Sequence, residues 1–423
     1  MIILVWRRFF AYHRGVKKLA LNLLGWLAKS IARKYRVKIV AITGSVGKTT
    51  TKEAVYSVLR QTYDVQRSLY NANTEWGIAA SVIAPGFEPE FTASGKARIS
   101  LPQFFMLCAK GVAKLIARQN YPVVLVLEMA ADRPGDIRWF NRWFKYDVAV
   151  VTTIGNSHLE FYKDQAELTA EKLLLTDALK PDGLAVINGE CDECQQFIHD
   201  SAKRKVTFGW NNFNNYWAED ADASFQYILH GPGGALTATL PQGRHFALAG
   251  LMAMAVGEEF GLTPIQIKQG LGGYRAISGR FEVKNAGRWM IIDDTYNASP
   301  ESMRAGLQGL RELAKGRKVA ILGGMRELGM VSPLSHRQVG EWAAKLTDLL
   351  IVIGQEGELI AEGAMGAGMP PQNIVKLIWD AERPRVDETV SQLLPILQDG
   401  DTVLVKASRA IHLDRLVGKL LAQ

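Results

Sequence analysis

Residues 37–51, which read VKIVAITGSVGKTTT, constrain the fold of this chain more than any other stretch. The apolar run that ends at Thr43 predicts a buried strand, and the small residues at 44–47 predict a tight turn into a helix that begins at Lys48. Backbone N–H groups and the helix dipole favour an anion at such a helix start. The stretch therefore predicts a strand, a phosphate-binding turn and a helix in an α/β protein.

The turn matches a short variant of the P-loop. The general pattern G-x-x-x-x-G-K-[ST] requires a glycine at the position that Ile42 occupies here, so the matching stretch is TGSVGKTT. In such a loop the lysine reaches the terminal phosphates of a nucleotide, and the hydroxyl of the next residue ligates Mg²⁺. The residues predicted to bind the nucleotide are Gly44, Ser45, Val46, Gly47, Lys48, Thr49 and Thr50.

Apolar runs that alternate with helical stretches follow this loop. The runs at 121–130, 146–155 and 182–189 predict buried strands of a parallel sheet that is covered on both faces. Residues 205–242 change to alternating and aromatic segments, which predict a small antiparallel patch. The runs WMIIDDTYNA, KVAILGG, DLLIVIG and DTVLVKAS repeat the α/β pattern. We therefore expect an α/β fold with a central P-loop domain and a Rossmann-like C-terminal domain.

The same pass along the chain predicts its division into parts. We expect a basic amphipathic segment at 1–36, a central ATP-binding domain at 37–282 and a C-terminal domain at 283–423. The stretch ISGRFEV is predicted to be the hinge between the two domains. The less regular segment 87–121 is predicted to hold a loop and an inserted helix.

Most of the net charge of +8 lies at the N-terminus. Ten Lys or Arg residues occur in positions 1–38, and the first acidic residue is Glu53. This distribution argues against nucleic acid as a partner of the folded body. The three cysteines, Cys108, Cys191 and Cys194, are too few for a disulfide framework and predict a cytoplasmic protein. For the lone C-x-x-C pair we expect surface thiols rather than a zinc site.

Residues 1–34 predict a basic amphipathic helix that lies on an anionic membrane surface, at the inner face of the membrane. No apolar run reaches the roughly 18 residues that span a bilayer, and no signal-peptide cleavage site is present. A helix that packs on its own protein is the alternative. The apolar positions are Leu19, Leu23, Trp26, Leu27 and Ile31, and the polar positions are Lys18, Asn22, Lys29 and Arg33.

Eight short stretches occur in an order that is typical of one family. On these stretches the chain resembles the Mur ligases, ATP-dependent amide-forming enzymes of peptidoglycan assembly, over residues 37–423. It resembles most closely the members that add D-alanyl-D-alanine. The stretches are TGSVGKTT, NTEWG at 73–77, EMAADRPGDI at 128–137, NSHLEFY at 156–162, GRFE at 279–282, DDTYNASPESM at 293–303, MRELG at 325–329 and KASR at 406–409.

The resemblance implies a reaction and its partners. ATP converts a carboxylate to an acyl phosphate, and an amine then attacks it to give an amide, ADP and phosphate. The implied acceptor carries a peptide, with a UDP-muramoyl peptide as the candidate, and the implied amine is an amino acid or a dipeptide. This chemistry belongs to peptidoglycan and cell wall biogenesis.

The resemblance also implies roles for individual residues. Lys48 would contact the β and γ phosphates, while Thr49 and Glu128 would hold a first Mg²⁺. Glu128 ends a buried run, where a carboxylate is costly without a cation. His158 would hold a second Mg²⁺ together with Lys172, if that lysine is carbamylated to an anionic oxygen ligand.

Residues near and beyond the hinge are implied to complete the site. Arg280 would meet the γ-phosphate, and Asp294 and Asn297 would reach the nucleotide from the C-terminal domain. A further set is implied near the substrate or at the domain interface: Lys406, Ser408 and Arg409.

Departures from the family pattern leave two alternatives. Where the family has H-N-x-x-N, this chain has His245, Phe246 and Ala249. The family's Gly-Asp-Met is Gly-Gly-Met at 323–325. Some 36 leading residues are too few for the usual N-terminal UDP-sugar domain of ~80–100 residues. One alternative is another ligase of the superfamily with a different acceptor, although Gly-Lys-Thr-Thr argues against a folate-type enzyme. The other is a membrane-associated nucleotide-binding pseudo-ligase without turnover.

Overall fold

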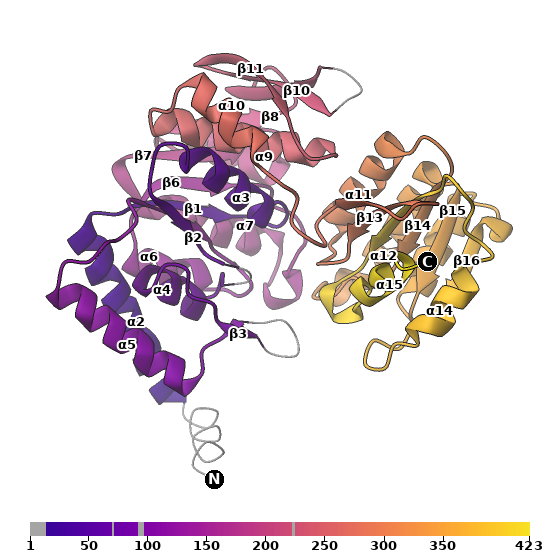
Figure 1. The fold of residues 1–423 in the computed structure, drawn as a ribbon, viewed down its shortest axis with the longest axis horizontal. Coiled ribbons are helices and arrows are strands. Elements are labelled where there is room, and N and C mark those ends of the chain that lie inside the picture. Colours follow the sequence, from indigo (N-terminus) through magenta and orange to yellow (C-terminus); the bar gives the residue numbers. More distant parts are fainter. Residues whose placement is uncertain (1–13, 70–71, 92–96, 222–224) are drawn as a thin grey trace, which may run out of the picture.

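The computed structural model describes residues 14–69, 72–91, 97–221 and 225–423 (Figure 1). Two sheets with helices on their faces form two halves of the molecule, and the chain passes from one to the other near residue 280. Part of the predicted membrane segment, residues 1–13, lies outside the described residues. The mixed α/β fold predicted from the sequence is confirmed.

The larger sheet contains nine strands within the described residues. They are β1 (Lys38–Thr43), β2 (Val65–Arg67), β5 (Val124–Glu128), β6 (Tyr146–Val151), β7 (Leu179–Asn188), β8 (Lys205–Gly209), β9 (Tyr216–Asp220), β10 (Gln226–Gly231) and β11 (Gly234–Thr239). Their order is β11-β10-β9-β8-β7-β6-β1-β5-β2, with antiparallel pairs only at β9-β10 and β10-β11. The predicted antiparallel patch therefore continues the parallel sheet at one edge. A separate small ladder pairs β3 (Glu90–Phe91) with β4 (Ala97–Arg98).

Helices cover both faces of this sheet. Alternate residues of β1 show why: Val40 and Ile42 join the core beneath α3 and α9, while Ile39 and Ala41 join the core beneath α2, α4 and α6. The helices are α2 (Arg14–Tyr35), α3 (Lys48–Leu59), α4 (Glu75–Ile83), α5 (Leu101–Ile116), α6 (Asp136–Trp143), α7 (Gln165–Leu173), α8 (Gln195–Asp200), α9 (Arg244–Glu259) and α10 (Pro264–Gly272), with 3₁₀ turns η1 (Leu159–Phe161), η2 (Leu174–Ala178) and η3 (Asp192–Cys194). Helix α5 is the predicted insertion within 87–121.

The second sheet has six strands in the described residues, in the order β12-β13-β17-β14-β15-β16, and only β12 is antiparallel. The strands are β12 (Glu282–Asn285), β13 (Met290–Asp294), β14 (Lys318–Leu322), β15 (Leu349–Ile353), β16 (Ile374–Leu377) and β17 (Thr402–Lys406). The helices are α11 (Pro300–Leu313), α12 (Ser332–Leu346), α13 (Gly357–Gly366), α14 (Val386–Leu393) and α15 (Asp414–Leu420), with 3₁₀ turns η4 (Gly329–Val331), η5 (Pro371–Asn373) and η6 (Arg409–Ile411). Parallel strands of both sheets thus direct their carboxyl ends to loops that can carry a site.

Helix α2 packs on its own protein, through part of the predicted apolar face and through apolar residues outside it. Its buried apolar side chains include Leu24 and Ala28, whereas three of the five predicted apolar positions are exposed. The prediction of one face was wrong because apolar residues surround more of the helix than the stripe that α4 and α5 cover. No helix in the described ranges is long and apolar enough to cross a membrane. The exposed positions are Leu19, Leu23 and Trp26.

The prediction of surface thiols at the C-x-x-C pair was wrong. Cys191 and Cys194 are buried and pack with Val151 and Ile187 in a small core of their own. The Cys191 sulfur contacts the backbone of Ile154, which belongs to the segment after β6. The two thiols act as small apolar core residues that cover the face of the sheet at β6 and β7.

Candidate functional site

The P-loop turn joins β1 to α3 as predicted, and α3 begins at Lys48. Gly44 has φ 143°, and a Cβ there would lie 2.0 Å from the Thr152 hydroxyl, so only glycine fits. The Ser45 N–H donates to the Thr153 carbonyl at 2.6 Å, which ties the turn to the segment after β6. The turn therefore directs the free backbone N–H groups at the start of α3 toward the space beyond the end of β1.

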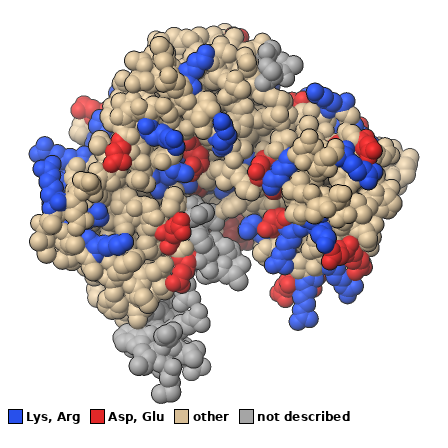
Figure 2. Space-filling model, in the orientation of Figure 1, with Lys and Arg blue, Asp and Glu red and all other residues tan. Residues whose placement is uncertain are grey.

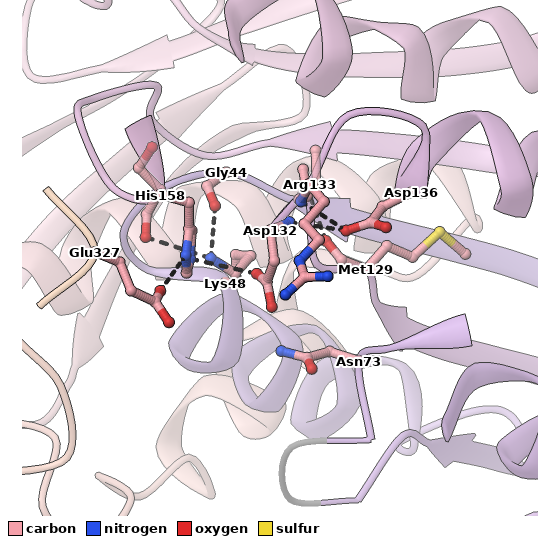
Figure 3. A network of polar contacts seen from close by, with 12 residues as sticks. Gly44, Lys48, Asn73, Met129, Asp132, Arg133, Asp136, His158 and Glu327 are labelled. Carbon is pink, nitrogen blue, oxygen red and sulfur yellow. Dashed lines mark hydrogen bonds and ion pairs between the residues drawn. The ribbon is translucent and has the colours of Figure 1, made fainter. Parts of the chain in front are cut away.

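Lys48 folds back over this turn. Its Nζ donates to the Gly44 carbonyl at 2.6 Å and to the Ser45 carbonyl at 3.3 Å (Figure 3). Burial lowers the pKa of the Lys48 amine, and the charges of Glu128 and Asp132 act in the opposite direction. The amine is therefore placed directly beside the turn, where a terminal phosphate would be neutralised.

Glu128 ends β5 and is buried. Its Oε1 accepts a hydrogen bond from Asn73 at 3.4 Å, and its Oε2 lies 3.4 Å from the Nζ of Lys52. Burial opposes ionisation, but the positive charges of Lys52 and Arg280 hold the pKa of the Glu128 carboxyl below its ordinary value. The carboxylate is thus kept anionic inside the protein.

Sequence reasoning missed Lys52, although a signal was present. Lys52 follows Lys48 by one helical turn, so both side chains lie on the same side of α3. A lysine that is only 1% exposed needs a nearby anion, which Glu128 supplies.

His158 connects the two halves of the molecule. Its Nε2 lies 3.3 Å from Asp132 Oδ1, and its Nδ1 lies 2.5 Å from Glu327 Oε2 (Figure 3). Asp132 follows β5, whereas Glu327 follows β14 of the second sheet. Close by, the Asn156 N–H donates to Glu301 Oε1 of α11 at 2.8 Å. Asp132 and Glu327 lie within the quoted stretches EMAADRPGDI and MRELG, but sequence reasoning did not single them out.

Lys172 is fully buried in α7, and its Nζ has no hydrogen-bond partner among the described residues. Burial lowers the pKa of the Lys172 amine to about 7, and the charge of Lys48 adds to this effect. The neutral amine is the form that can react with CO₂, and a pKa of about 7 leaves a large fraction of Lys172 neutral at pH 7. The structure does not pair Lys172 with His158, whose ring nitrogens face Asp132 and Glu327 instead.

The predicted residues beyond the hinge also meet. Asp294 Oδ2 lies 2.7 Å from the Nζ of Lys406, which is buried and also donates to the Asn297 carbonyl at 2.9 Å. The Arg280 guanidinium lies 4.0 Å from the centre of the Tyr296 ring, and its charge reaches Lys48. The start of the second sheet is therefore linked electrostatically to the P-loop.

One cavity gathers residues from both sheets. Of the predicted site residues, only Gly44 and Lys172 do not line it. At the positions of the family pattern H-N-x-x-N, the retained His245 and the substituted Ala249 line the cavity, whereas Phe246 is buried in the core. The predicted residues that line it are Ser45, Val46, Gly47, Lys48, Thr49, Thr50, Glu128, His158, Arg280, Asp294, Asn297, Lys406, Ser408 and Arg409.

These residues fit a nucleotide with Mg²⁺. The start of α3, Lys48 and Arg280 supply positive charge for phosphates, and the buried Oε2 of Glu128, although ion-paired with Lys52, accepts no hydrogen bond from the described residues. No three His, Cys, Asp or Glu side chains gather as a metal cage in the described ranges. Mg²⁺ is commonly held by one or two carboxylates together with substrate phosphates, so Glu128 and Thr49 beside a nucleotide suffice.

Comparison with known proteins identifies the family. The model for the Mur ligase middle domain matches residues 42–257, and the model for the Mur ligase, glutamate ligase domain matches residues 279–409. The chain therefore belongs to the Mur ligase family. It is an ATP-dependent, ADP-forming ligase that uses ATP and Mg²⁺, as the resemblance in its sequence predicted.

Individual relatives are similar over nearly the whole chain. The UDP-N-acetylmuramoyl-tripeptide–D-alanyl-D-alanine ligase of Bacillus subtilis is 28% identical over 95% of this chain and 79% of its own length. The structure of MurF ligase from Thermotoga maritima in complex with ADP has a TM-score of 0.77 and 25% identity, covering 95% of this chain and 83% of that one. Folylpolyglutamate synthase of Mycobacterium tuberculosis, with a TM-score of 0.66 and 16% identity over 95% of each chain, shares the fold.

Proposed function

We propose that this chain joins D-alanyl-D-alanine to the peptide of a UDP-N-acetylmuramoyl tripeptide. The carboxylate of the acceptor would attack the γ-phosphorus of ATP and release ADP. The amine of the dipeptide would then attack the acyl carbon, so that phosphate leaves and the amine loses a proton. The observation that carries this proposal is the cavity that joins the P-loop to residues of the second sheet, in a chain similar to ligases named for this reaction.

The residues of the cavity would act mainly by positioning and charge neutralisation. Lys48 and the N–H groups of the turn would hold the terminal phosphates, with Arg280 facing the γ-phosphate. Glu128 and Thr49 would hold Mg²⁺, which supplies further neutralisation of the phosphate charge. Asp294 and Asn297 would contact the nucleotide from the second sheet, which would help exclude water from a labile acyl phosphate.

A second metal position involves His158 and Lys172. We propose that Lys172 is carbamylated and becomes an anionic oxygen ligand, because its amine is buried, has no hydrogen-bond partner among the described residues and has a pKa of about 7. His158 would leave its contacts with Asp132 and Glu327 to share this ligand set.

Labelled bicarbonate tests the carbamate directly. Protein equilibrated with ¹³C-bicarbonate is expected to show a carbamate signal by NMR, and Lys172→Gln is expected to lose it. Lys345→Gln, a substitution of an exposed lysine in α12, is the matched control and should keep the signal. A wild-type spectrum without a carbamate signal would refute the modification.

We also propose the placement and division of the chain. The two sheets support a central domain at 37–282 and a C-terminal domain at 283–423. Three free cysteines support a cytoplasmic location. The basic segment 1–34 supports contact with the anionic inner face of the membrane.

A product assay decides among the candidate functions. Purified full-length protein with ATP, Mg²⁺, the UDP-linked tripeptide and D-alanyl-D-alanine is expected to release phosphate and to form a product heavier than the acceptor by the dipeptide less one water. Turnover only with another peptide acceptor would favour a different ligase of the superfamily. Nucleotide binding without turnover on any acceptor would favour the pseudo-ligase.

A further inference from the structure

Helices α2 and α5 form an outer pair on the first half of the molecule. Gly111 of α5 lies against Leu27 of α2 and Ile83 of α4, and the small residue permits this close approach. Lys34 near the end of α2 donates to the Lys114 carbonyl near the end of α5 at 2.8 Å. The two helices therefore run side by side in the same direction, with α4 beneath them.

The outward sides of both helices are apolar. On α2 the exposed positions follow a spacing of four and three residues, which places them in one stripe. Helix α5 buries Leu107 on its inner side, yet Phe105 on its outer side is 62% exposed and Ile116 is 80% exposed. A helix that is apolar on both sides normally has cover on both. We define the α2–α5 face by these exposed residues: Leu19, Leu23, Trp26, Phe105, Met106, Val112 and Ile116.

Positive charge frames this face. Neither helix contains an acidic residue, and the sequence has none in 1–52 or in 91–127. Figure 2 shows mostly uncharged surface at the lower left of the molecule, where α5 lies in Figure 1, with blue side chains at its upper left edge. The basic residues on the two helices include Lys17, Lys18, Lys29, Arg33, Lys110 and Lys114.

We propose that the α2–α5 face docks on an anionic phospholipid bilayer. Apolar side chains, a tryptophan and a surrounding frame of Lys and Arg are the combination that binds at the lipid–water interface. The thirteen residues that precede α2 continue this composition, since MIILVWRRFFAYH contains apolar residues and two arginines but no acid. Charge complementarity and this adjoining segment both favour an anionic leaflet over a protein partner.

This proposal does not rest on the ligase function, and it goes beyond a tether at the N-terminus. In the sequence, helix α5 lies between β2 and β5, two strands of the first sheet. It packs on α2 and α4 rather than on a separate module. Contact through both helices would fix the orientation of the catalytic half against the bilayer. Contact through residues 1–34 alone would restrain the catalytic half along one helix only.

Vesicle sedimentation with the full-length chain tests the proposal. Wild-type protein is expected to sediment with vesicles of phosphatidylcholine and phosphatidylglycerol at low salt, and less with phosphatidylcholine alone. The double variant Phe105→Glu and Ile116→Glu, which leaves residues 1–34 intact, should lower the partition coefficient by about tenfold or more. Ile378→Glu paired with Leu334→Glu is the matched control, because both residues are exposed in the second half of the molecule, and it should bind as wild type does.

Three results would overturn the proposal. The α5 double variant could sediment as wild type does, which would assign binding to residues 1–34 alone. Wild-type protein could form a dimer in sedimentation velocity that the same variant abolishes, without binding vesicles, which would assign the face to a second copy. A chain without residues 1–13 could bind vesicles when the full chain does not, which would show that this segment covers the face. Equal melting temperatures would establish that the variants are folded.

Discussion

Helices α3 and α2 lie on opposite faces of the same sheet and are held there by different interactions. The start of α3 is fixed by backbone groups of the P-loop turn and by two lysines that face carbonyls and a buried carboxylate. Helix α2 is fixed by a stripe of apolar side chains spread over two turns. The first arrangement concentrates function in a few polar atoms, whereas the second spreads stability over many contacts.

The largest expected effect is on catalysis and concerns the P-loop end of α3, where function depends on a few polar atoms. Replacing Lys48 with Ala is expected to lower kcat/KM on the order of 10³-fold, because phosphoryl transfer depends on preorganised positive charge. The melting temperature should stay close to that of wild type, since the hydrogen bonds that the amine makes in the described part of the chain go to its own turn. Phosphate release and calorimetry measure the two quantities. Lys345→Ala is the control on an exposed lysine, and wild-type turnover in Lys48→Ala would contradict the role of this site.

For α2, whose stability is spread over many apolar contacts, we predict the reverse: a substitution should lower stability and leave kcat unchanged. Leu27 is 2% exposed and lies against α5, so Leu27→Ala is expected to lower the free energy of unfolding by about 2–5 kcal/mol. The kcat of the folded fraction should be unchanged, because α2 does not line the cavity. Urea denaturation followed by circular dichroism gives the free energy. A large loss of kcat with unchanged stability would remove the contrast between the two helices.

The smallest expected effect separates the two sides of α2. Leu23 is 44% exposed, so Leu23→Ala should change the free energy of unfolding by no more than about 0.5 kcal/mol. The same denaturation experiment measures this value. Equal destabilisation by the substitutions at 23 and 27 would mean that α2 is buried on both sides.

The sequence predicted what local chemistry determines. Glycines at 44 and 47, with φ of 143° and 85°, specify the turn without help from distant residues, so the end of β1 and the first residue of α3 were predicted correctly. The sequence predicted one apolar face on α2 but not which part of the helix is buried, because that depends on α4 and α5, which follow by tens of residues. The apolar runs that predicted the two α/β sheets needed only burial on both faces.

Contacts between distant segments account for what sequence reasoning missed in the site. Glu327 contacts His158 from a loop of the second sheet, and Asp132 contacts it from a different loop of the first sheet. Such pairs are decided by the approach of separate elements and not by spacing along the chain. The same reason explains why the burial of the C-x-x-C pair against the sheet at β6 and β7 was not predicted.

The ion pair between Lys52 and Glu128 has a consequence for a cell that is starved of magnesium. Because Lys52 balances the charge of Glu128 inside the protein, we expect the fold to persist when no divalent cation is bound. Chelation of magnesium would therefore stop catalysis without exposing the enzyme to proteolysis, since degradation follows unfolding. When magnesium returns, catalysis could resume from molecules already made, with no delay for new synthesis.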